Sequence, residues 1–223
     1  MGFRRAAVSF ALRGVVNTLC KVDCSEYVDA LSKNEPLIVI MNHTNFLEVP
    51  ILVAHSYPIK VTGVAKTETW DNPIFAFLFN TYRAIPIDRR GAFQDVFLRV
   101  KTAIKNGSFV CLFPEGTRSK NGVLGEGKAG IILMAMEVGA PVLPVVHYGG
   151  ERIWENMKRF RRTPFCFKAG RPFRINFKGR PDRAARAVIL GEVMGQMSRL
   201  LPAEMRGSCT PYKEDECRYL EFL

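Results

Sequence analysis

Short hydrophobic runs alternate with longer segments of mixed polarity along most of this chain. Each run is too short for a helix and is bounded by polar residues, which predicts a buried strand. The runs occupy residues 36–41, 59–65, 83–88, 108–113 and 141–149. In the intervening segments, apolar residues recur every three or four positions, which is the helical period. These segments occupy residues 46–56, 72–82, 91–107, 127–140 and 182–201.

Two further segments, residues 164–170 and 173–179, alternate apolar and polar residues one by one. A period of two predicts strands with one buried face, and the short gap between them favours a two-stranded ribbon. The residues after Pro202 are mostly polar, and we expect them to form a mobile tail.

The alternation of strands and helices predicts an α/β fold, a single layered domain whose central, largely parallel β-sheet is flanked by helices. We place this domain at residues 36–201, between an N-terminal helical segment at residues 1–35 and a C-terminal tail at residues 202–223. Ligands of such sheets collect beyond the carboxyl ends of the strands. Polar residues that directly follow a strand are therefore the first candidates for a functional site.

The N-terminal segment predicts an amphipathic helix. A polar stripe recurs every four residues, and apolar residues cover much of the remaining circumference. The stripe is Arg5, Ser9, Arg13 and Asn17, and the apolar residues are Phe3, Val8, Leu12, Val15 and Leu19. No run reaches the length of a bilayer span, and no cleavage site of a signal peptide is evident. A basic, largely apolar helix can lie in the plane of a membrane interface, and packing against the domain is the alternative.

Composition and cysteine content narrow the class of protein. The 223 residues are 48% hydrophobic, which suits a sizeable core and excludes a disordered chain. The six cysteines include no C-x-x-C pair, and Cys20 and Cys24 have no histidine nearby. The sequence therefore predicts reduced thiols and no zinc site.

The charge of the chain is positive and local. There are 32 Lys and Arg against 21 Asp and Glu, a net charge of +11. Between Asn156 and Arg183 there are ten basic residues and one acid, which leaves +2 for the rest of the chain. Such a local surplus indicates an anionic partner, which could be a phospholipid surface, a phosphorylated small molecule or a nucleic acid.

His43 and Glu48 are the first candidates for catalysis. His43 follows the predicted strand at residues 36–41, and Glu48 lies five residues further on, at the start of a predicted helix. From that position the carboxylate can reach back to one ring nitrogen, fix the tautomer and stabilise the imidazolium that forms when the other nitrogen takes a proton. Taken alone the pattern is weak, because a structural histidine would give the same spacing.

A second candidate follows the strand at residues 108–113. Gly116, Thr117, Arg118 and Ser119 supply a flexible backbone, hydroxyls and a guanidinium, which are the groups that bind a phosphate monoester. The spacing of a nucleotide-binding loop is absent. Further positive charge follows two other predicted strands, from Lys66 and from Arg89 and Arg90. Each of these segments by itself also suits a solvated surface.

Together and in this order, "NHTNFLE", "GVAKTE", "IPIDR", "FPEGTRS" and "VLPVV" resemble the glycerolipid acyltransferase superfamily, specifically the 1-acylglycerol-3-phosphate O-acyltransferase (PlsC-like) family. The resemblance covers about half of the chain, from His43 to Val146. It implies that His43 and Glu48 are catalytic. It also implies a phosphate-binding set, which is Glu115, Gly116, Thr117, Arg118, Lys66 and Arg89.

Three positions depart from the usual pattern of this family. Glu48 replaces the usual Asp, which keeps the carboxylate and adds one methylene. Asn45 replaces the usual Ser, so a role proposed for that serine does not carry over. Ala84 stands where a glycine often precedes the I-P-I-D-R block.

The resemblance implies an enzyme that moves a fatty acyl group from an acyl thioester to the free hydroxyl of 1-acylglycerol 3-phosphate, giving phosphatidic acid. His43 would remove the proton of the attacking hydroxyl, and Glu48 would orient the imidazole. The route needs neither a metal nor a cofactor, and acyl-CoA or acyl carrier protein is the donor substrate. The expected partners are the lysophospholipid, the donor and an anionic membrane surface. We expect a cytoplasmic protein, peripherally associated with the inner face of the membrane.

Two alternatives stay open at this point. An acyltransferase, transacylase or hydrolase that acts on another lysophospholipid would use the same base. A nucleic-acid-binding module without catalysis is the other, because basic and aromatic residues interleave after Met157. However, Phe165 and Phe167 alternate with polar residues, as do Phe173 and Phe177, which places each pair on one strand face, toward the core. We therefore expect no nucleic acid partner.

Overall fold

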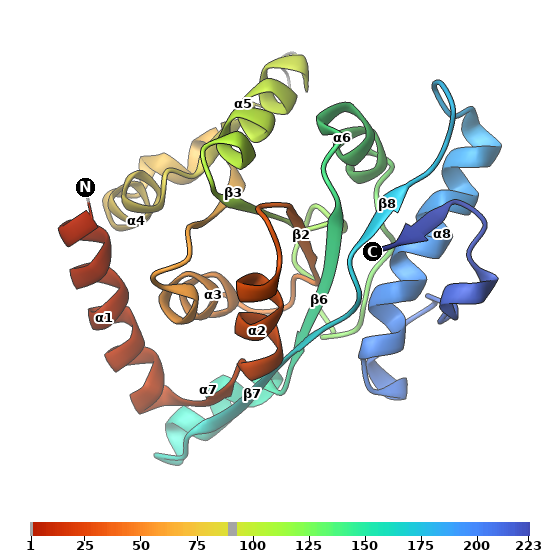
Figure 1. The fold of residues 1–223 in the computed structure, drawn as a ribbon. Coiled ribbons are helices and arrows are strands. Elements are labelled where there is room, and N and C mark those ends of the chain that lie inside the picture. Colours follow the sequence, from red (N-terminus) through yellow and green to blue (C-terminus); the bar gives the residue numbers. More distant parts are fainter. Residues whose placement is uncertain (1, 89–92) are drawn as a thin grey trace.

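A computed structural model describes residues 2–88 and 93–223 of the chain (Figure 1). The helices in this part are α1 (Gly2–Leu19), α2 (Ser25–Lys33), α3 (Glu48–Ser56), α4 (Pro73–Tyr82), α5 (Phe93–Lys105), α6 (Gly130–Val138), α7 (Ile153–Lys158) and α8 (Arg183–Leu200). The strands are β1 (Cys20–Asp23), β2 (Ile38–Met41), β3 (Val61–Lys66), β4 (Ile85–Ile87), β5 (Phe109–Leu112), β6 (Val142–Tyr148), β7 (Thr163–Ala169), β8 (Phe173–Ile175) and β9 (Leu220–Phe222).

The strands of the described residues form one nine-stranded sheet with the order β1-β7-β6-β2-β5-β3-β4, and β8 pairs with both β6 and β9. The pairs β1–β7, β6–β2, β2–β5, β5–β3 and β3–β4 are parallel. The pairs β6–β7, β6–β8 and β8–β9 are antiparallel. The predicted α/β fold with a largely parallel central sheet is confirmed.

The central strand β2 is buried on both faces, and its alternate residues enter two separate cores. Ile38 and Ile40 pack with residues of α5, α6 and α8, whereas Val39 and Met41 pack with residues of α1, α2 and α3. Figure 1 shows α1 and α3 on one side of β2 and β6, and α6 and α8 on the other. The chain that leaves β2 therefore starts from a rigid position at the centre of the sheet.

Local sequence signals set several helix ends. The side chain of Asn72 accepts hydrogen bonds from the backbone N–H groups of Ile74 and Phe75, and Pro73 occupies the first position of α4. Asp182 caps α8 in the same way through the N–H of Ala185, at 2.7 Å. These caps explain why α4 and α8 begin close to the ends predicted from the pattern.

The predicted two-stranded ribbon at residues 164–179 is wrong. β7 and β8 do not pair with each other, because both pair with β6. β7 pairs with the carboxyl-terminal part of β6, from Val145 to Tyr148, and β8 pairs with its first residue, Val142. β6 is seven residues long, so it can accept both strands on one edge, and their closeness in sequence does not make them partners.

The C-terminal residues fold back onto the domain. β9 pairs with β8, and the buried carboxylate of Glu192 on α8 accepts the backbone N–H groups of Arg218 and Tyr219, at 2.8 and 3.0 Å. The polar composition of this segment predicts a mobile tail, but these contacts give it a defined place in the sheet.

The polar stripe predicted on α1 faces the domain rather than solvent in its first half. Ser9 is buried, and its hydroxyl lies 2.8 Å from the hydroxyl of Tyr82. The guanidinium of Arg5 donates to the backbone oxygens of Ile59 and Val61, at 3.3 and 3.1 Å. Arg5 and Ser9 face the domain because each forms hydrogen bonds there. These bonds satisfy polar groups that would otherwise be buried without partners.

Apolar side chains occupy the outer surface of α1 and of the neighbouring α4. Phe3, Phe10 and Val15 are exposed, with Phe3 at 88%, and Ile74 and Phe77 of α4 are exposed as well. In the described part of the chain, no helix combines the length and the hydropathy that crossing a bilayer requires.

Candidate active site

The loop that leaves β2 is tied to the end of β6 by Asn42. The side-chain amide of Asn42 donates to the backbone oxygen of His147 at 2.9 Å, and the backbone N–H of His147 donates to the side-chain oxygen of Asn42 at 2.8 Å. Both residues are buried. The two strand ends are therefore locked together where the predicted site begins.

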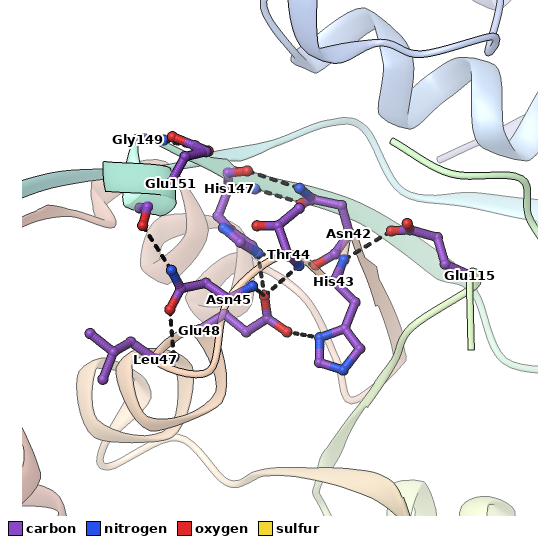
Figure 2. Close-up of polar contacts among 11 residues, drawn as sticks. Asn42, His43, Thr44, Asn45, Leu47, Glu48, Glu115, His147, Gly149 and Glu151 are labelled. Atoms are coloured by element: carbon purple, nitrogen blue, oxygen red, sulfur yellow. Dashed lines mark hydrogen bonds and ion pairs between the residues drawn. The ribbon is translucent and has the colours of Figure 1, made fainter. Parts of the chain in front are cut away.

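Glu48, the first residue of α3, is completely buried and is the centre of the site (Figure 2). Its Oε1 contacts Nδ1 of His43, the partner predicted from the sequence. Its Oε2 accepts the backbone N–H groups of Thr44 and Asn45, both at 3.0 Å, and lies 2.7 Å from Nε2 of His147. The start of a helix also favours a negative charge, so the fold stabilises an ionised carboxylate here.

These contacts determine the charge of Glu48. Burial by itself would raise the pKa of this carboxyl, but the hydrogen bonds from His147 and His43 outweigh burial and lower the pKa to about 2. Glu48 is therefore a carboxylate at neutral pH and can stabilise positive charge on a neighbouring imidazole.

His43 is held on several sides, and one ring nitrogen stays available. Its ring stacks on Phe113 with centroids 4.3 Å apart, its backbone N–H donates to Glu115 at 2.9 Å, and its backbone oxygen accepts the N–H of Ser119 at 2.6 Å. The side chain is 22% exposed. No described residue binds Nε2, which in Figure 2 lies on the side of the ring away from Glu48. The imidazole therefore has the placement that a general base needs.

The structure adds a second histidine that sequence reasoning missed. His147 lies in β6, and its fully buried ring packs against Phe165 and Phe167. Its Nε2 lies near two acceptors, Oε2 of Glu48 and the backbone oxygen of Asn42 at 3.1 Å, so Nε2 must carry a proton. Its Nδ1 has no partner among the described residues. His147 therefore donates through Nε2, on the side of the ring that faces Glu48.

The only signal for His147 in the sequence was its place near the end of a predicted strand. β2 and β6 are parallel neighbours with Met41 opposite Val145, so His43, two residues beyond Met41, lies beside His147 near the end of β6. The sequence does not contain this strand order, because β2 and β6 lie about one hundred residues apart.

Glu115 joins the two predicted motifs. Its buried carboxylate accepts the backbone N–H of His43 on one oxygen and that of Gly125, at 3.0 Å, on the other. Burial raises the pKa of Glu115, and these two hydrogen bonds offset only part of that effect. Glu115 therefore holds the loop of His43 against the loop that carries Arg118.

The remaining members of the predicted phosphate-binding set face the same opening. Gly116 has a positive φ of 68°, a conformation that favours glycine. A Cβ at this position would also lie 3.2 Å from the side chain of Lys128. Lys128 therefore lies beside Gly116 and lines the same cavity, a position that the sequence did not predict. Thr117, Arg118 and Lys66 are exposed and line the cavity described below, whereas Arg89 lies outside the described residues.

His43 opens into a cavity of about 1400 Å³. Sites for a single small ligand usually measure roughly 300–1,000 Å³, so this volume suits two substrates or one with a long chain. One wall of the cavity comes from the apolar helix α4, and three basic residues line the same cavity as His43. The α4 residues are Phe75, Leu78, Phe79 and Tyr82, and the basic residues are Lys66, Arg118 and Lys128.

Asn45, which replaces the usual serine, has a structural use. Its side chain is buried, donates to the backbone oxygen of Gly150 at 2.8 Å and accepts the N–H of Leu47 at 2.9 Å. It therefore fixes the turn between His43 and Glu48 to the segment that precedes α7.

All six cysteines are free thiols, as the sequence predicts.

Comparisons with known proteins agree with this fold and site. A family model described as Acyltransferase matches residues 21–148, more than half of the chain. The chain therefore belongs to the acyltransferase family, in the branch that contains the PlsC-like enzymes. The match ends at Tyr148, one residue after His147, and so includes His43, Glu48, Arg118 and His147.

Two relatives and one solved structure illustrate the similarity. The chain is 30% identical over 135 residues to the chloroplastic 1-acyl-sn-glycerol-3-phosphate acyltransferase BAT2 of Brassica napus, over 60% of this chain and 39% of that protein. It is 30% identical over 177 residues to an N-acylphosphatidylethanolamine synthase of Arabidopsis thaliana, over 70% of this chain and 62% of that one. The crystal structure of the acyltransferase PlsC from Thermotoga maritima has the same fold, with a TM-score of 0.58, 22% identity and coverage of 86% of this chain and 80% of that one.

The chain spans less than half of the length of the first plant relatives that it matches. The similarity therefore defines the family and the fold.

Proposed function

We propose that this protein is a 1-acylglycerol-3-phosphate O-acyltransferase. It moves a fatty acyl group from an acyl thioester to the free hydroxyl of 1-acylglycerol 3-phosphate, and the products are phosphatidic acid and a free thiol. The observation that carries the proposal is the pairing of His43 with the buried carboxylate of Glu48 at a large cavity whose rim holds Arg118. The names of several relatives support the same reaction.

In this mechanism His43 is the general base. Its Nε2 takes the proton of the acceptor hydroxyl while the hydroxyl oxygen attacks the thioester carbon. Glu48 stabilises the resulting imidazolium through its contact with Nδ1. The carbon–sulfur bond then breaks, and the imidazolium returns the proton to the leaving thiolate. No covalent acyl-enzyme is required. The route uses neither a metal nor a cofactor, since the carboxylate and the imidazole carry the proton transfer.

Basic groups at the cavity hold the phosphate of the acceptor. Arg118 can bind two phosphate oxygens, and Lys66 and Lys128 add charge on the same cavity. The turn at Gly116 and the hydroxyl of Thr117 lie beside Arg118. We also assign Arg89 to this set, on sequence grounds alone. Holding the phosphate places the free hydroxyl near His43, so that catalysis is largely a matter of positioning.

A second acceptor is supported by one observation. An Arabidopsis relative whose match covers 70% of this chain is named an N-acylphosphatidylethanolamine synthase. An acceptor with an ethanolamine headgroup would need the same base but less of the positive charge that Lys66, Arg118 and Lys128 bring to the cavity. The charge of the site therefore favours the phosphate monoester.

We further propose that the protein lies at the inner face of the membrane as a peripheral protein. The exposed apolar surface of α1 and α4 supports this placement, because Phe3, Phe10, Ile74 and Phe77 face outward and Arg4 lies 5.6 Å above the ring of Phe77. Acceptor and product both reside in the bilayer, so a site that opens beside such a surface avoids extraction of the lipid into water.

The proposal is tested by an assay of the purified protein with lysophosphatidate and a series of acyl thioesters, followed by the release of free thiol. Lysophosphatidylethanolamine and water alone serve as competing acceptors. The expected result is thiol release that depends on lysophosphatidate. Release at the same rate without an acceptor would identify a hydrolase instead, and a preference for the ethanolamine lipid would identify the second acceptor.

A further inference from the structure

α7 and the turn that follows it expose three apolar side chains. Phe160 is 100% exposed, Trp154 is 60% exposed and Met157 is also exposed. Isolated exposed apolar residues are common on protein surfaces, but three within seven residues, two of them large aromatics, form a patch that is typical of an interaction site. Residues 154–162 are called the α7 turn.

The backbone presents Phe160 in a conformation that side chains rarely adopt. Its φ is +53°, in the left-handed region, which is unfavourable for a bulky residue other than glycine. The turn is nevertheless well defined, because the N–H groups of Arg159 and Arg161 donate to the backbone oxygen of Asn156, and that of Phe160 donates to Met157. Phe160 therefore combines a strained backbone with a side chain that does not pack into the core.

Basic side chains surround this ring. From Met157 to Arg162 the sequence reads MKRFRR, with four basic residues and no acid. Arg162 is engaged by the fold, since its guanidinium donates to the backbone oxygen of Cys20 at 2.7 and 3.1 Å. Lys158, Arg159 and Arg161 are exposed beside Phe160. An exposed aromatic side chain with basic neighbours is complementary to a surface that has an apolar interior and anionic groups at its edge.

The α7 turn lies close to both the active site and α1. Trp154 stacks on Phe46, with centroids 5.1 Å apart, and Phe46 belongs to the loop between His43 and Glu48. Trp154, Phe46 and Arg118 line a second cavity of about 360 Å³. On the other side, β1 pairs with β7 and the Arg162 contact reaches the residue that follows α1, so the turn lies next to the end of α1 (Figure 1).

We propose that the α7 turn is a second contact with the membrane, in which Phe160 and Trp154 enter the interface of an anionic bilayer and Lys158, Arg159 and Arg161 bind lipid phosphates. Together with the outer surface of α1 it would hold the protein at two places and orient the cavity toward the lipid. Two weak anchors bind more firmly than one. The inference rests on the proposed function only in that the substrate is a lipid.

Charge and shape favour a bilayer over other occupants. A second copy of this chain would bring the same net charge of +11 to the contact. Single-stranded nucleic acid needs a row of rings on which successive bases can stack. The neighbouring phenylalanines of this segment, Phe165, Phe167 and Phe173, are buried. Trp154 is already stacked on Phe46, and Phe160 has no ring partner among the described residues, so the exposed rings form no continuous row. Exposed rings beside exposed cations suit a fluid surface that carries negative headgroups.

The test is co-sedimentation of the full chain with vesicles of phosphatidylcholine alone or with phosphatidylglycerol added. Phe160→Asn removes the ring and keeps a residue that tolerates a positive φ, so the variant should be at least as stable as the parent. The double variant Arg159→Glu, Arg161→Glu reverses the charge. The matched controls lie on α8: Val188→Asn removes an apolar residue that is 48% exposed, and Arg183→Glu reverses one exposed charge.

We expect Phe160→Asn to weaken binding to the anionic vesicles severalfold. Each basic group near an anionic surface contributes about fivefold to binding, so the double variant should bind at least tenfold more weakly, and both controls should bind like the parent. Parent-like binding by Phe160→Asn and the double variant would overturn the proposal, as would an equal loss in the controls. A loss of self-association or of nucleic acid retention with no change in vesicle binding would also overturn it and identify a different occupant.

A further measurement separates this inference from the proposed reaction. Thiol release with a short-chain, water-soluble lysophosphatidate does not need a membrane, and we expect Phe160→Asn to match the parent there. If the parent shows no acyl transfer at all but the vesicle results hold, the reaction is wrong and the membrane contact stands. A loss of soluble activity in Phe160→Asn would show that the turn acts on the site itself and would overturn its assignment as a lipid contact.

Discussion

His147 and Glu48 are 99 positions apart in the sequence, yet Nε2 of the histidine lies 2.7 Å from Oε2 of the carboxylate and both side chains are fully buried. Glu48 therefore contacts two histidines, His43 at the cavity and His147 in the core. The buried histidine supplies a fixed donor that occupies one carboxylate oxygen, so the other oxygen is aimed at His43.

This relationship predicts different outcomes for two substitutions at His147. His147→Gln keeps an N–H donor at nearly the place of Nε2 and should retain most of the activity. His147→Phe removes the donor, which leaves more of the carboxylate charge for His43 and favours its protonated form. We expect the acidic limb of the pH profile of kcat/KM to move to higher pH in His147→Phe and to stay in place in His147→Gln. Equal profiles for both variants would assign His147 to packing alone.

The general base predicts the largest single effect on activity. His43→Ala should lower kcat by roughly 10²–10⁴, because the acceptor hydroxyl then loses its proton only to water. The ring of His43 is partly exposed, so the fold should survive, and circular dichroism and thermal unfolding serve as the control. Turnover at the parent rate in a folded His43→Ala protein would refute the assignment.

The carboxylate at position 48 should matter through its charge more than its length. Glu48→Gln keeps the shape and removes the charge that stabilises the imidazolium, so we expect a loss of roughly 10²–10⁴ in kcat/KM. Glu48→Asp keeps the charge and lengthens the contact with His43, so it should retain a measurable part of the activity. If the Gln variant matched the parent in thiol release, Glu48 would serve structure alone.

Arg118 should act on the acceptor and not on the donor. Arg118 is exposed on the cavity that contains His43, and loss of a charge-assisted contact with phosphate costs about 1.5–3 kcal/mol. Arg118→Ala should therefore raise the KM for lysophosphatidate roughly ten- to hundredfold, while the KM for the acyl thioester changes little. Steady-state kinetics with each substrate varied in turn measure the two effects. Equal damage toward an acceptor without phosphate would contradict the assignment.

The low pKa of Glu48 predicts how the stability of the fold depends on pH in the acidic range. Its pKa is about 2 in the folded protein against an ordinary value of 4.5, a difference that corresponds to about 3 kcal/mol. Because the folded pKa is the lower one, this stabilisation is fully present above pH 4.5 and is lost as the pH falls toward 2. Urea denaturation across this range should show a smaller decline of the unfolding free energy in Glu48→Gln than in the parent. Parallel declines would show that other groups carry the acid sensitivity.

Much of the fold followed from patterns that are local in the sequence. The runs at residues 36–41 and 108–113 became β2 and β5, and the segments at residues 72–82 and 182–201 became α4 and α8. A strand that is buried on both faces has a continuous apolar run, and a helix with one buried face has apolar residues every three to four positions. The burial of each of these elements is therefore visible in its own sequence. Short elements with mixed polarity, such as β1, α2 and α7, were not predicted because they contain too few residues for either pattern to be recognised.

For the site, the sequence by itself determined the pairing of His43 with Glu48, since five residues at the start of a helix are enough to bring a carboxylate back to its own loop. It also determined the separate motif that carries Arg118. The tertiary structure decided the rest. It brought His147 to Glu48 and turned Glu115 toward the backbone of His43. It also put the first half of the polar stripe of α1, Arg5 and Ser9, against the domain and the phenylalanines of α1 outside. These contacts depend on strand order and on which face of a helix is covered, and both follow from packing between segments that are distant in the chain.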